Sequence, residues 1–419
     1  GLKKPFFENF RFWKNDPISP GLRVNTTSGI VRGQTIHVLN IGINQFLNIP
    51  YAEPPVGKLR FNKPLPIQTP RDIDATKPGN SCLQPVFESI EHFMGNLTTS
   101  EDCLVLNIWT LNGGNSNSSQ ESPLKPVMFW IHGGGLYSGS IFQRQYNGSA
   151  LAAQNVVFVS ANYRLGPFGF LYGDREDAPG NVGFYDQLLA LKWVRENIHA
   201  FGGDRDQITI FGQSAGSWSV SAHILSPLSA GAFQRAIMES GAHLYNKDRD
   251  LVPKSNALYK AKQMAIQLNC SLDDNQWLEC LRGIDGKEFY SLYTKNPLTV
   301  PTLDTEFLPM SAQMAFKTNH FNKVDILSGV TLHEGSWMTS VILGEVPHNL
   351  TETDFTNFVH LLQTIFPYLD ANNITDFYLG DIDKTSSHDI QWAMYDLFGD
   401  LFLTCPTYMF ATNYAKYSQ

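Results

Sequence analysis

Residues 208–216 read Ile-Thr-Ile-Phe-Gly-Gln-Ser-Ala-Gly, which places Ser214 between two glycines directly after a short β-branched and aromatic run. The run at 208–211 predicts a strand, and the apolar spacing of residues 215–225 predicts a helix. Small residues at 212 and 216 allow the backbone to bend sharply between the two elements. A glycine-rich loop with a solvated serine would share the pentapeptide, but not the strand and helix that flank it. The stretch therefore predicts a serine hydroxyl lifted out at a tight strand-to-helix turn.

The same order, a short apolar strand followed by an amphipathic helix, recurs along the chain. Such alternation predicts the α/β class, with a mostly parallel central sheet covered by helices on both faces. A serine turn of this kind is the nucleophile elbow of the α/β-hydrolase fold. After Leu251 the pattern becomes irregular and helix-rich, which predicts a helical elaboration after the fourth or fifth parallel strand, within a single domain spanning residues 1–419. The predicted strands are 104–109, 127–131, 156–160, 208–211, 236–238 and 324–327, a further predicted helix is 185–194, and a predicted solvated loop is 113–122.

Composition and charge exclude several classes of protein. The chain has 419 residues, of which 42% are hydrophobic and 17% charged, as expected for a globular protein with a large core. Its formal net charge of -8 leaves no basic surplus to neutralise phosphates, so a nucleic-acid partner is not expected. No run of 18 apolar residues predicts a membrane span. The oligomeric state is left open by the sequence.

Cysteines and glycosylation sequons together indicate an oxidising, secretory route. None of the five cysteines has a CxxC spacing, which leaves disulfides or buried thiols. Seven sequons favour disulfides, because secreted chains are both glycosylated and oxidised. Cysteines close in sequence are then expected to pair, Cys82 with Cys103 and Cys270 with Cys280, which leaves Cys405 unpaired in this chain. The predicted glycosylation sites are Asn25, Asn96, Asn117, Asn147, Asn269, Asn349 and Asn373.

A second chemical element is the glycine run 132–139, His-Gly-Gly-Gly-Leu-Tyr-Ser-Gly, directly after the strand-like residues 128–131. Attack on an ester carbonyl creates an oxyanion, and a loop without side chains lets backbone N–H groups point at that charge. Gly134, Gly135 and the N–H of Ala215 are the predicted donors. A flexible linker is the alternative, but a linker rarely follows a buried strand so abruptly. His132 precedes the nucleophile and heads the loop, so we expect it to hold the loop rather than to act as the base.

Further blocks are spread over essentially the whole chain. They are residues 49–57 with 59–61, 100–104 with 106–108, 163–166 with 168–170, 180–181 with Gly183 and 186–187, and 201–204. These blocks resemble the type-B carboxylesterase and cholinesterase family of serine hydrolases. By this resemblance, Arg60 and Glu101 form a structural ion pair, and both cysteine pairs match the family's first two disulfides.

The resemblance also assigns the triad acid and indicates that the triad histidine is missing from this sequence. In this fold the triad follows the order Ser, then Asp or Glu, then His. Residues 329–336 resemble the family's acid loop, which assigns the acid to Glu334. The family's histidine lies further downstream in a Gly-x-x-His-x-x-acid setting, which His348, His360 and His388 all lack. We therefore expect a fragment without the C-terminal part of the family, and the same truncation accounts for Cys405, whose partner lies in the missing tail.

The expected activity is two-step ester hydrolysis through an acyl-enzyme on Ser214, with no metal or organic cofactor. The chain itself should be nearly inactive without its base. Choline-ester specificity is weakened because no Trp lies between Cys82 and Cys103, where Phe87 and Phe93 are the aromatics, and because Gln213 replaces the usual Glu. Residues 294–299 lack the phenylalanines that narrow a cholinesterase acyl pocket. A secreted general carboxylesterase is therefore favoured, with any membrane anchor in the missing tail. A cholinesterase, a slow sequestering esterase and a non-catalytic adhesion member of the fold are the alternatives.

Overall fold

The structure is a computed structural model that describes residues 22–38, 40–85, 97–111, 123–243, 251–272, 276–293, 300–343, 349–364 and 366–418. Several sequence predictions lie outside these residues, so their structure is not discussed. They are the glycosylation sites Asn96 and Asn117, the aromatic residues Phe87 and Phe93, the histidine candidate His348, the acyl-pocket residues 294–299 and the predicted loop 113–122.

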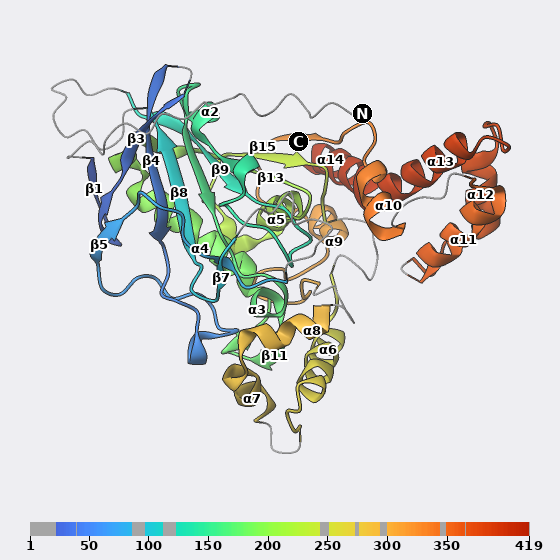
Figure 1. Ribbon diagram of the computed structural model, residues 1–419, viewed down its shortest axis with the longest axis horizontal. Coiled ribbons are helices and arrows are strands. Elements are labelled where there is room, and N and C mark those ends of the chain that lie inside the picture. The colour runs from blue at the N-terminus through green and yellow to red at the C-terminus, as the bar shows by residue number, and fades with distance from the viewer. Residues whose placement is uncertain are drawn as a thin grey trace, which may run out of the picture.

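A sheet of eight strands forms the centre of the molecule, in the order β15-β14-β13-β9-β10-β8-β4-β3 (Figure 1). The strands from β15 to β10 pair in parallel, whereas β8, β4 and β3 are added antiparallel. The central sheet is thus of the mixed, mostly parallel type expected for an α/β-hydrolase. Its strands are β3 (Gln34–Val38), β4 (Ile41–Pro50), β8 (Val105–Thr110), β9 (Lys125–Ile131), β10 (Val157–Ala161), β13 (Gly203–Gln213), β14 (Arg235–Glu239) and β15 (Asp325–Gly329).

The predicted strands are confirmed, with two informative differences. β13 begins at Gly203, five residues before the predicted start. The prediction missed this part of the strand because residues 204–207 are polar. They span a shift in the register between β13 and β9. β3 and β4 were not expected because their sequences do not form apolar runs. In β4 the side chains of Asn44 and Gln45 are buried among apolar neighbours, so the strand carries no clean apolar pattern.

Smaller strands and many helices surround this sheet. The outer strands are β1 (Arg23–Thr26), β2 (Gly29–Arg32), β5 (Arg71–Asp74), β6 (Ser81–Cys82), β7 (Thr99–Ser100), β11 (Tyr172–Arg175) and β12 (Ala178–Pro179). The α-helices are α2 (Ser149–Ala152), α3 (Gly166–Phe170), α4 (Val182–Asn197), α5 (Ala215–Leu225), α6 (Lys254–Gln267), α7 (Trp277–Gly283), α8 (Tyr290–Tyr293), α9 (Ala312–Lys317), α10 (Gly335–Leu343), α11 (Glu352–Gln363), α12 (Ala371–Leu379), α13 (Ser387–Gly399) and α14 (Cys405–Tyr417).

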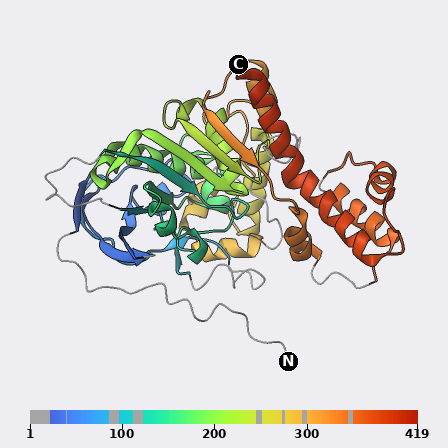
Figure 2. The same ribbon diagram turned by 90° about the horizontal axis from the view of Figure 1, so that it is seen from above.

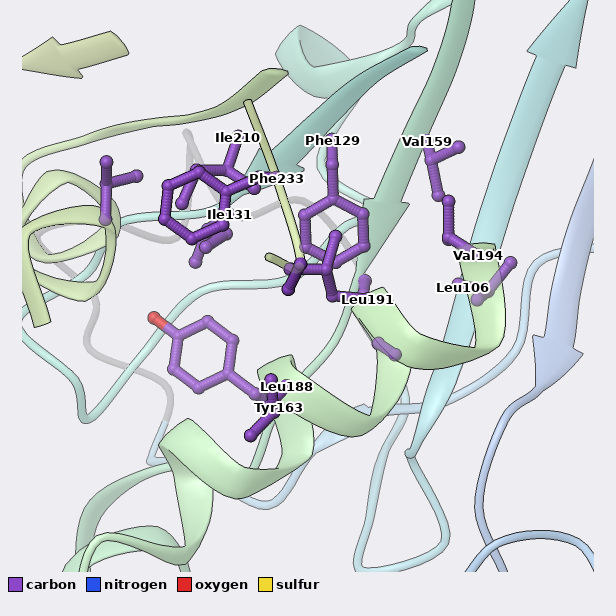
Figure 3. Packing of buried hydrophobic residues seen from close by; sticks show 14 of the residues in the cluster. Leu106, Phe129, Ile131, Val159, Tyr163, Leu188, Leu191, Val194, Ile210 and Phe233 are labelled. Atoms are coloured by element: carbon purple, nitrogen blue, oxygen red, sulfur yellow. The ribbon is translucent and has the colours of Figure 1, made fainter. Parts of the chain in front are cut away.

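Helices cover both faces of the sheet because successive strand residues point to opposite sides. Figure 3 shows Leu188, Leu191 and Val194 of α4 against Phe129 of β9 and Val159 of β10 on one face. The residues between these strand positions, which include Trp130 and Phe158, belong to a second cluster on the other face, with Ala152 of α2. Two-sided burial explains why the parallel strands read as continuous apolar runs.

The helical elaboration also appears where it is expected. α6 to α9 lie between β14 and β15, the fourth and fifth parallel strands, and α10 to α14 follow β15. Figures 1 and 2 show α11, α12 and α13 extending away from the sheet as an arm, with α13 and α14 running almost end to end. The arm has its own small core, built around Phe355, Phe358 and Leu397. In the part of the chain that the structure describes, no helix has the length and apolarity that a bilayer crossing requires.

Covalent and ionic predictions are confirmed where the structure describes them. Disulfides join Cys82 to Cys103 and Cys270 to Cys280, and Cys405 is an exposed free thiol in α14. The Arg60 guanidinium donates to both carboxylate oxygens of Glu101, at 2.8 and 2.6 Å. Among the described sequons, four asparagines are exposed and one is half-buried, so all of them retain solvent access. The exposed ones are Asn25, Asn269, Asn349 and Asn373, and the half-buried one is Asn147.

Removing the second disulfide should destabilise the protein measurably. It joins the end of α6 to α7 and closes a short loop, with a sequence separation of 10. The loss of this cross-link from the unfolded chain predicts a fall of about 2–3 kcal/mol in the free energy of unfolding for a Cys270→Ser, Cys280→Ser double variant. Urea unfolding checks this value. The matched control is Cys405→Ser, which removes an unpaired thiol and should leave stability within about 0.5 kcal/mol of the starting protein.

Candidate active site

Ser214 occupies the turn between β13 and α5, where the sequence predicts it. Its backbone has φ 57° and ψ -123°, a conformation that non-glycine residues rarely adopt. The turn is secured on both sides, because the Ser214 N–H donates to the carbonyl of Glu239 at 2.9 Å and the Trp218 N–H donates to the Ser214 carbonyl at 2.9 Å. Ser214 is half-buried. The geometry lifts its side chain out of the strand at the carboxyl edge of the parallel sheet.

The glycine loop packs directly against this serine. Gly133 approaches so closely that a Cβ at that position would lie 2.6 Å from the Gln213 carbonyl oxygen and 3.3 Å from the Ser214 Cβ. Glycine is therefore the residue type that fits here, which explains the side-chain-free stretch in the sequence. The loop then tightens on itself, because the Gly134 carbonyl accepts from the N–H groups of Tyr137 and Ser138 at 3.1 and 2.9 Å. The loop and the nucleophile thus form one contiguous surface.

The three predicted oxyanion donors are the N–H groups of Gly134, Gly135 and Ala215. Among the described residues, these groups donate to no acceptor. Ala215 is the first residue of α5, so its N–H is also one of the groups that a helix leaves unsatisfied at its N-terminus. Free N–H groups beside a half-buried serine provide a favourable environment for a developing negative charge.

Glu334 lies in the loop that follows β15, two strands from the nucleophile. The strand ends are in register, since the Ser240 N–H donates to the Gly329 carbonyl at 2.9 Å beside the bond from Ser214 to Glu239. Glu334 accepts from the Thr331 N–H at 2.7 Å, which fixes its carboxylate at the start of α10. The side chain lines an open cleft of about 410 Å³. The cleft is also lined by Tyr395 and Asp396 of α13 and by Asp400, which begins the π-helical segment between α13 and α14.

None of the described histidines hydrogen-bonds to Ser214 or Glu334. His360 in α11 pairs with Gln363 at 2.8 Å. The serine-rich residues before His388 resemble a loop, but the Ser386 side chain accepts from the Asp389 N–H and caps α13, so that His388 lies in the first turn of this helix. There it accepts from the Trp392 indole at 2.9 Å. Neither candidate therefore forms the hydrogen bond that a triad histidine makes to the nucleophile or to the acid.

His132 supports the glycine loop, in agreement with the sequence prediction. It is fully buried, and its ring stacks on Tyr163 with centroids 4.5 Å apart, while the Tyr163 hydroxyl donates to the His132 carbonyl at 2.8 Å. Its Nδ1 lies 2.9 Å from the Gly133 carbonyl oxygen. Burial lowers the pKa of His132 to about 4. A neutral, enclosed imidazole stabilises the loop but offers no base to the substrate side.

Sequence analysis did not single out Trp218 as a neighbour of the nucleophile, although it lies one helical turn after Ser214. A Cβ at Gly241 would lie 2.8 Å from the Ser214 carbonyl oxygen and 2.9 Å from the indole of Trp218, so these three residues are in close contact. The indole also lies near the buried His243, with ring centroids 6.3 Å apart. The i, i+4 spacing from the nucleophile was the available signal, but it does not distinguish a site-lining aromatic from a core residue.

Three buried histidines should make the fold sensitive to acid. Burial lowers the pKa of His223 and of His243 to about 3, and that of His132 to about 4. In the unfolded chain each titrates near 6.5, so below that pH the unfolded state binds more protons than the folded state. The free energy of unfolding should therefore fall as pH decreases from about 6.5 toward 4, by up to about 1.4 kcal/mol per pH unit for each histidine.

Urea unfolding at pH 7.5, 6.5, 5.5 and 5.0 measures this dependence. The His223→Gln variant removes one of the three groups and should show a smaller slope between pH 6.5 and 5.0. The exposed His360, replaced by Gln, is the matched control and should leave the slope unchanged. Equal slopes for His223→Gln and the starting protein would show that His223 is protonated as readily in the fold as outside it.

Residues 20–419 match the sequence profile of the carboxylesterase family. The chain belongs to the carboxylesterase family. Three relatives at similar identity are acetylcholinesterases. That of Leptinotarsa decemlineata is 35% identical over 96% of this chain and 68% of its own length, and that of Bungarus fasciatus is 36% identical over 94% and 67%. Acetylcholinesterase-1 of Trittame loki is 35% identical over 94% of this chain and 74% of its own length.

Membership of the carboxylesterase family confirms the resemblance drawn from the motifs and the α/β-hydrolase fold. It also supports carboxylic ester hydrolysis as the general chemistry of the protein.

Proposed function

We propose that this chain carries the nucleophile, the triad acid and the oxyanion donors of a serine carboxylic-ester hydrolase. The observation that carries the proposal is the strained backbone of Ser214, with φ 57° and ψ -123°, at the junction of β13 and α5. Backbone strain persists where surrounding structure enforces it, and it clusters at active sites. In this proposal the strain has a function, because the strained turn places the Ser214 side chain beside the N–H groups of Gly134, Gly135 and Ala215.

The proposed reaction has two steps. The Ser214 Oγ attacks the ester carbonyl carbon while its proton passes to the triad histidine, and the carbonyl oxygen becomes an oxyanion at the three N–H groups. The oxyanion collapses, the C–O bond to the alcohol breaks, and the histidine returns the proton to the alcohol. Water then attacks the acyl-enzyme in the same way and releases the carboxylic acid. Glu334 orients the histidine and stabilises its charged form.

The histidine is proposed to come from residues beyond Gln419. Two features support this placement. The two described candidates, His360 and His388, hydrogen-bond to Gln363 and Trp392. The cleft of about 410 Å³ beside Glu334 offers space for a further segment. An isolated 1–419 chain is accordingly expected to turn over esters at no more than a residual rate, from binding and the oxyanion donors alone.

Secretion and glycosylation form part of the proposal. Two disulfides and five solvent-accessible sequons are consistent with an oxidising compartment. Mass spectrometry before and after treatment with a peptide N-glycosidase would detect occupied sites at Asn25, Asn147, Asn269, Asn349 and Asn373. A protein secreted from eukaryotic cells without any glycan at these residues would contradict this part.

The proposed substrate class is a general carboxylic ester. Support comes from the residue before the nucleophile, Gln213, which is exposed and uncharged and so offers no negative charge to a quaternary ammonium. The second candidate is choline-ester hydrolysis, which is favoured by the three relatives that are acetylcholinesterases. A third outcome, an adhesion member without catalysis, is disfavoured because the nucleophile, the loop and the acid are all retained.

Two measurements on the full-length protein test these assignments. Labelling with a fluorophosphonate followed by peptide mapping should modify Ser214, and 1-naphthyl acetate should be hydrolysed with a higher kcat/KM than acetylthiocholine. A reversed preference would establish the choline-ester reading. A folded protein that neither labels at Ser214 nor hydrolyses either ester would overturn the enzymatic proposal in favour of an adhesion role.

A further inference from the structure

A buried side-chain amide from another segment of the chain hydrogen-bonds to the glycine loop. Gln84 follows β6, two residues after the half-cystine Cys82, and is 1% exposed. Its Nε2 donates to the Gly139 carbonyl at 2.8 Å and to the Cys82 carbonyl at 2.9 Å, and its Oε1 accepts from the Gly139 N–H at 2.7 Å. One carboxamide thus satisfies both backbone groups of Gly139 and ties that residue to the disulfide.

Gly139 is connected to the catalytic serine by direct packing through His132 and Gly133. It adopts φ 114°, and a Cβ at this position would overlap the Gly133 carbonyl oxygen and the His132 ring, so Gly139 packs directly on residues 132–133. Gly133 in turn packs on Ser214. A displacement of Gly139 would therefore be passed to the face on which the oxyanion donors lie.

Neighbouring hydrogen bonds also hold the segment around residues 80–84 to the chain that follows the glycine loop, but they involve residues 140–141 rather than the loop itself. The Ser81 Oγ donates to the Ser140 Oγ at 2.8 Å. The Ile141 N–H donates to the Asn162 Oδ1 at 3.0 Å, and the Asn162 Nδ2 donates to the Asn80 carbonyl at 3.2 Å. These contacts anchor residues 140–141, which follow the glycines. Gln84 is the member of this set that bonds to a glycine of the 132–139 loop.

These hydrogen bonds matter because glycine has no side chain that restricts its backbone conformation. A loop rich in glycine has many accessible backbone conformations, and its ordering must come from outside contacts. Oxyanion donors act at 2.7–3.1 Å from the oxyanion, and a misplacement of about 1 Å can cost about 100-fold in rate. Three sets of bonds fix residues 134 and 135: the turn bonds to the Gly134 carbonyl, the bond from the Gly166 N–H to the Leu136 carbonyl at 2.7 Å, and the bonds of Gln84 to Gly139 at the end of the loop.

We propose that Gln84 is a positioning residue for the oxyanion hole. It holds the loop 132–139 in the arrangement in which the N–H groups of Gly134 and Gly135 face the oxyanion formed at Ser214. The inference rests on the proposed ester-hydrolase function and deepens it. It states that the chemical step depends on Gln84, a residue that belongs neither to the triad nor to the loop 132–139.

The test compares Gln84→Ala with the starting enzyme as full-length proteins, with 1-naphthyl acetate as substrate and an aryl trifluoromethyl ketone as an analogue that forms the same oxyanion on the serine. We expect kcat to fall about 10- to 100-fold, as for a displaced oxyanion donor. KM should change less than about 3-fold, and the inhibition constant of the ketone should rise by the same factor as kcat falls. The matched control is Gln45→Ala, which removes a buried amide from β4, three strands away in the sheet from β9, and should leave kcat within about 3-fold.

A second variant, Gln84→Glu, gives a readout that a purely structural role would not produce. Its carboxylate retains an acceptor for the Gly139 N–H but faces two carbonyl oxygens without a donor. Protonation at lower pH restores one donor. The ratio of the kcat of Gln84→Glu to that of the starting enzyme should therefore rise as pH decreases. This comparison carries the test if Gln84→Ala does not fold.

Two results would overturn the inference. One is a folded Gln84→Ala enzyme with unchanged kcat and ketone affinity. The other is a loss of kcat in Gln84→Ala that the Gln45→Ala control matches, or that occurs without the parallel loss of ketone affinity. Turnover and fluorophosphonate labelling of the starting enzyme are measured first, and they report on the proposed function independently of either variant.

Discussion

Replacement of Ser214 by glycine is expected to abolish ester hydrolysis and at the same time make the folded protein more stable. The serine holds φ 57° and ψ -123°, which costs a non-glycine residue about 1–3 kcal/mol. Glycine adopts this conformation without the steric penalty, although its greater freedom in the unfolded chain returns about 0.5–1 kcal/mol. The free energy of unfolding should thus rise by about 0.5–2 kcal/mol.

Activity should fall by about 10⁶-fold in kcat, as for removal of a serine nucleophile. The control is Ser214→Ala, which loses the hydroxyl but keeps the Cβ that causes the strain. It should be as inactive as the glycine variant and close to the starting protein in stability. Urea unfolding and hydrolysis of 1-naphthyl acetate by the full-length proteins give both quantities. A glycine variant less stable than the alanine variant would show that the turn is not strained, and substantial residual turnover would assign the nucleophile to another residue.

Loss of the carboxylate of Asp186 is expected to be among the most destabilising single changes in this protein. Asp186, in α4, is fully buried and accepts three hydrogen bonds from Arg164, from its N–H at 2.9 Å, its Nε at 2.8 Å and its Nη2 at 2.6 Å. The Arg164 side chain is 3% exposed. Asp186→Ala would leave this guanidinium charged and unpaired in the core, at a cost of about 3–5 kcal/mol.

An exposed ion pair on the same molecule provides the comparison. Glu352 pairs with Lys384 at 2.8 Å, with side chains 48% and 42% exposed, and solvent screens that interaction. Glu352→Ala should therefore cost no more than about 1 kcal/mol. A double variant, Arg164→Met with Asp186→Leu, removes both buried charges and should recover most of the loss. If Asp186→Ala and Glu352→Ala destabilise the protein equally, the pair in the core is better solvated than its burial indicates.

Local pattern was enough to predict much of this fold. The parallel strands were predicted from short apolar runs, because strands buried on both faces must be apolar at every position. The predictions failed where burial and residue type diverge. Asn44 and Gln45 are buried in β4, the first residues of β13 are polar, and the Ser386 cap that begins α13 resembles loop sequence.

For the site, the sequence by itself determined the residue types that the chemistry needs: a serine between glycines after a strand, a glycine loop after another strand, and the pairing of nearby cysteines. These follow from interactions between residues close in the chain, which leave a readable local pattern. The tertiary structure alone decided which distant residues support them. Gln84 reaches Gly139, Trp218 contacts Gly241, and Arg164 pairs with Asp186 because the fold brings separate segments together. A hydrogen bond between residues far apart in sequence depends on the packing of the whole chain, so neither partner carries a local signal of it.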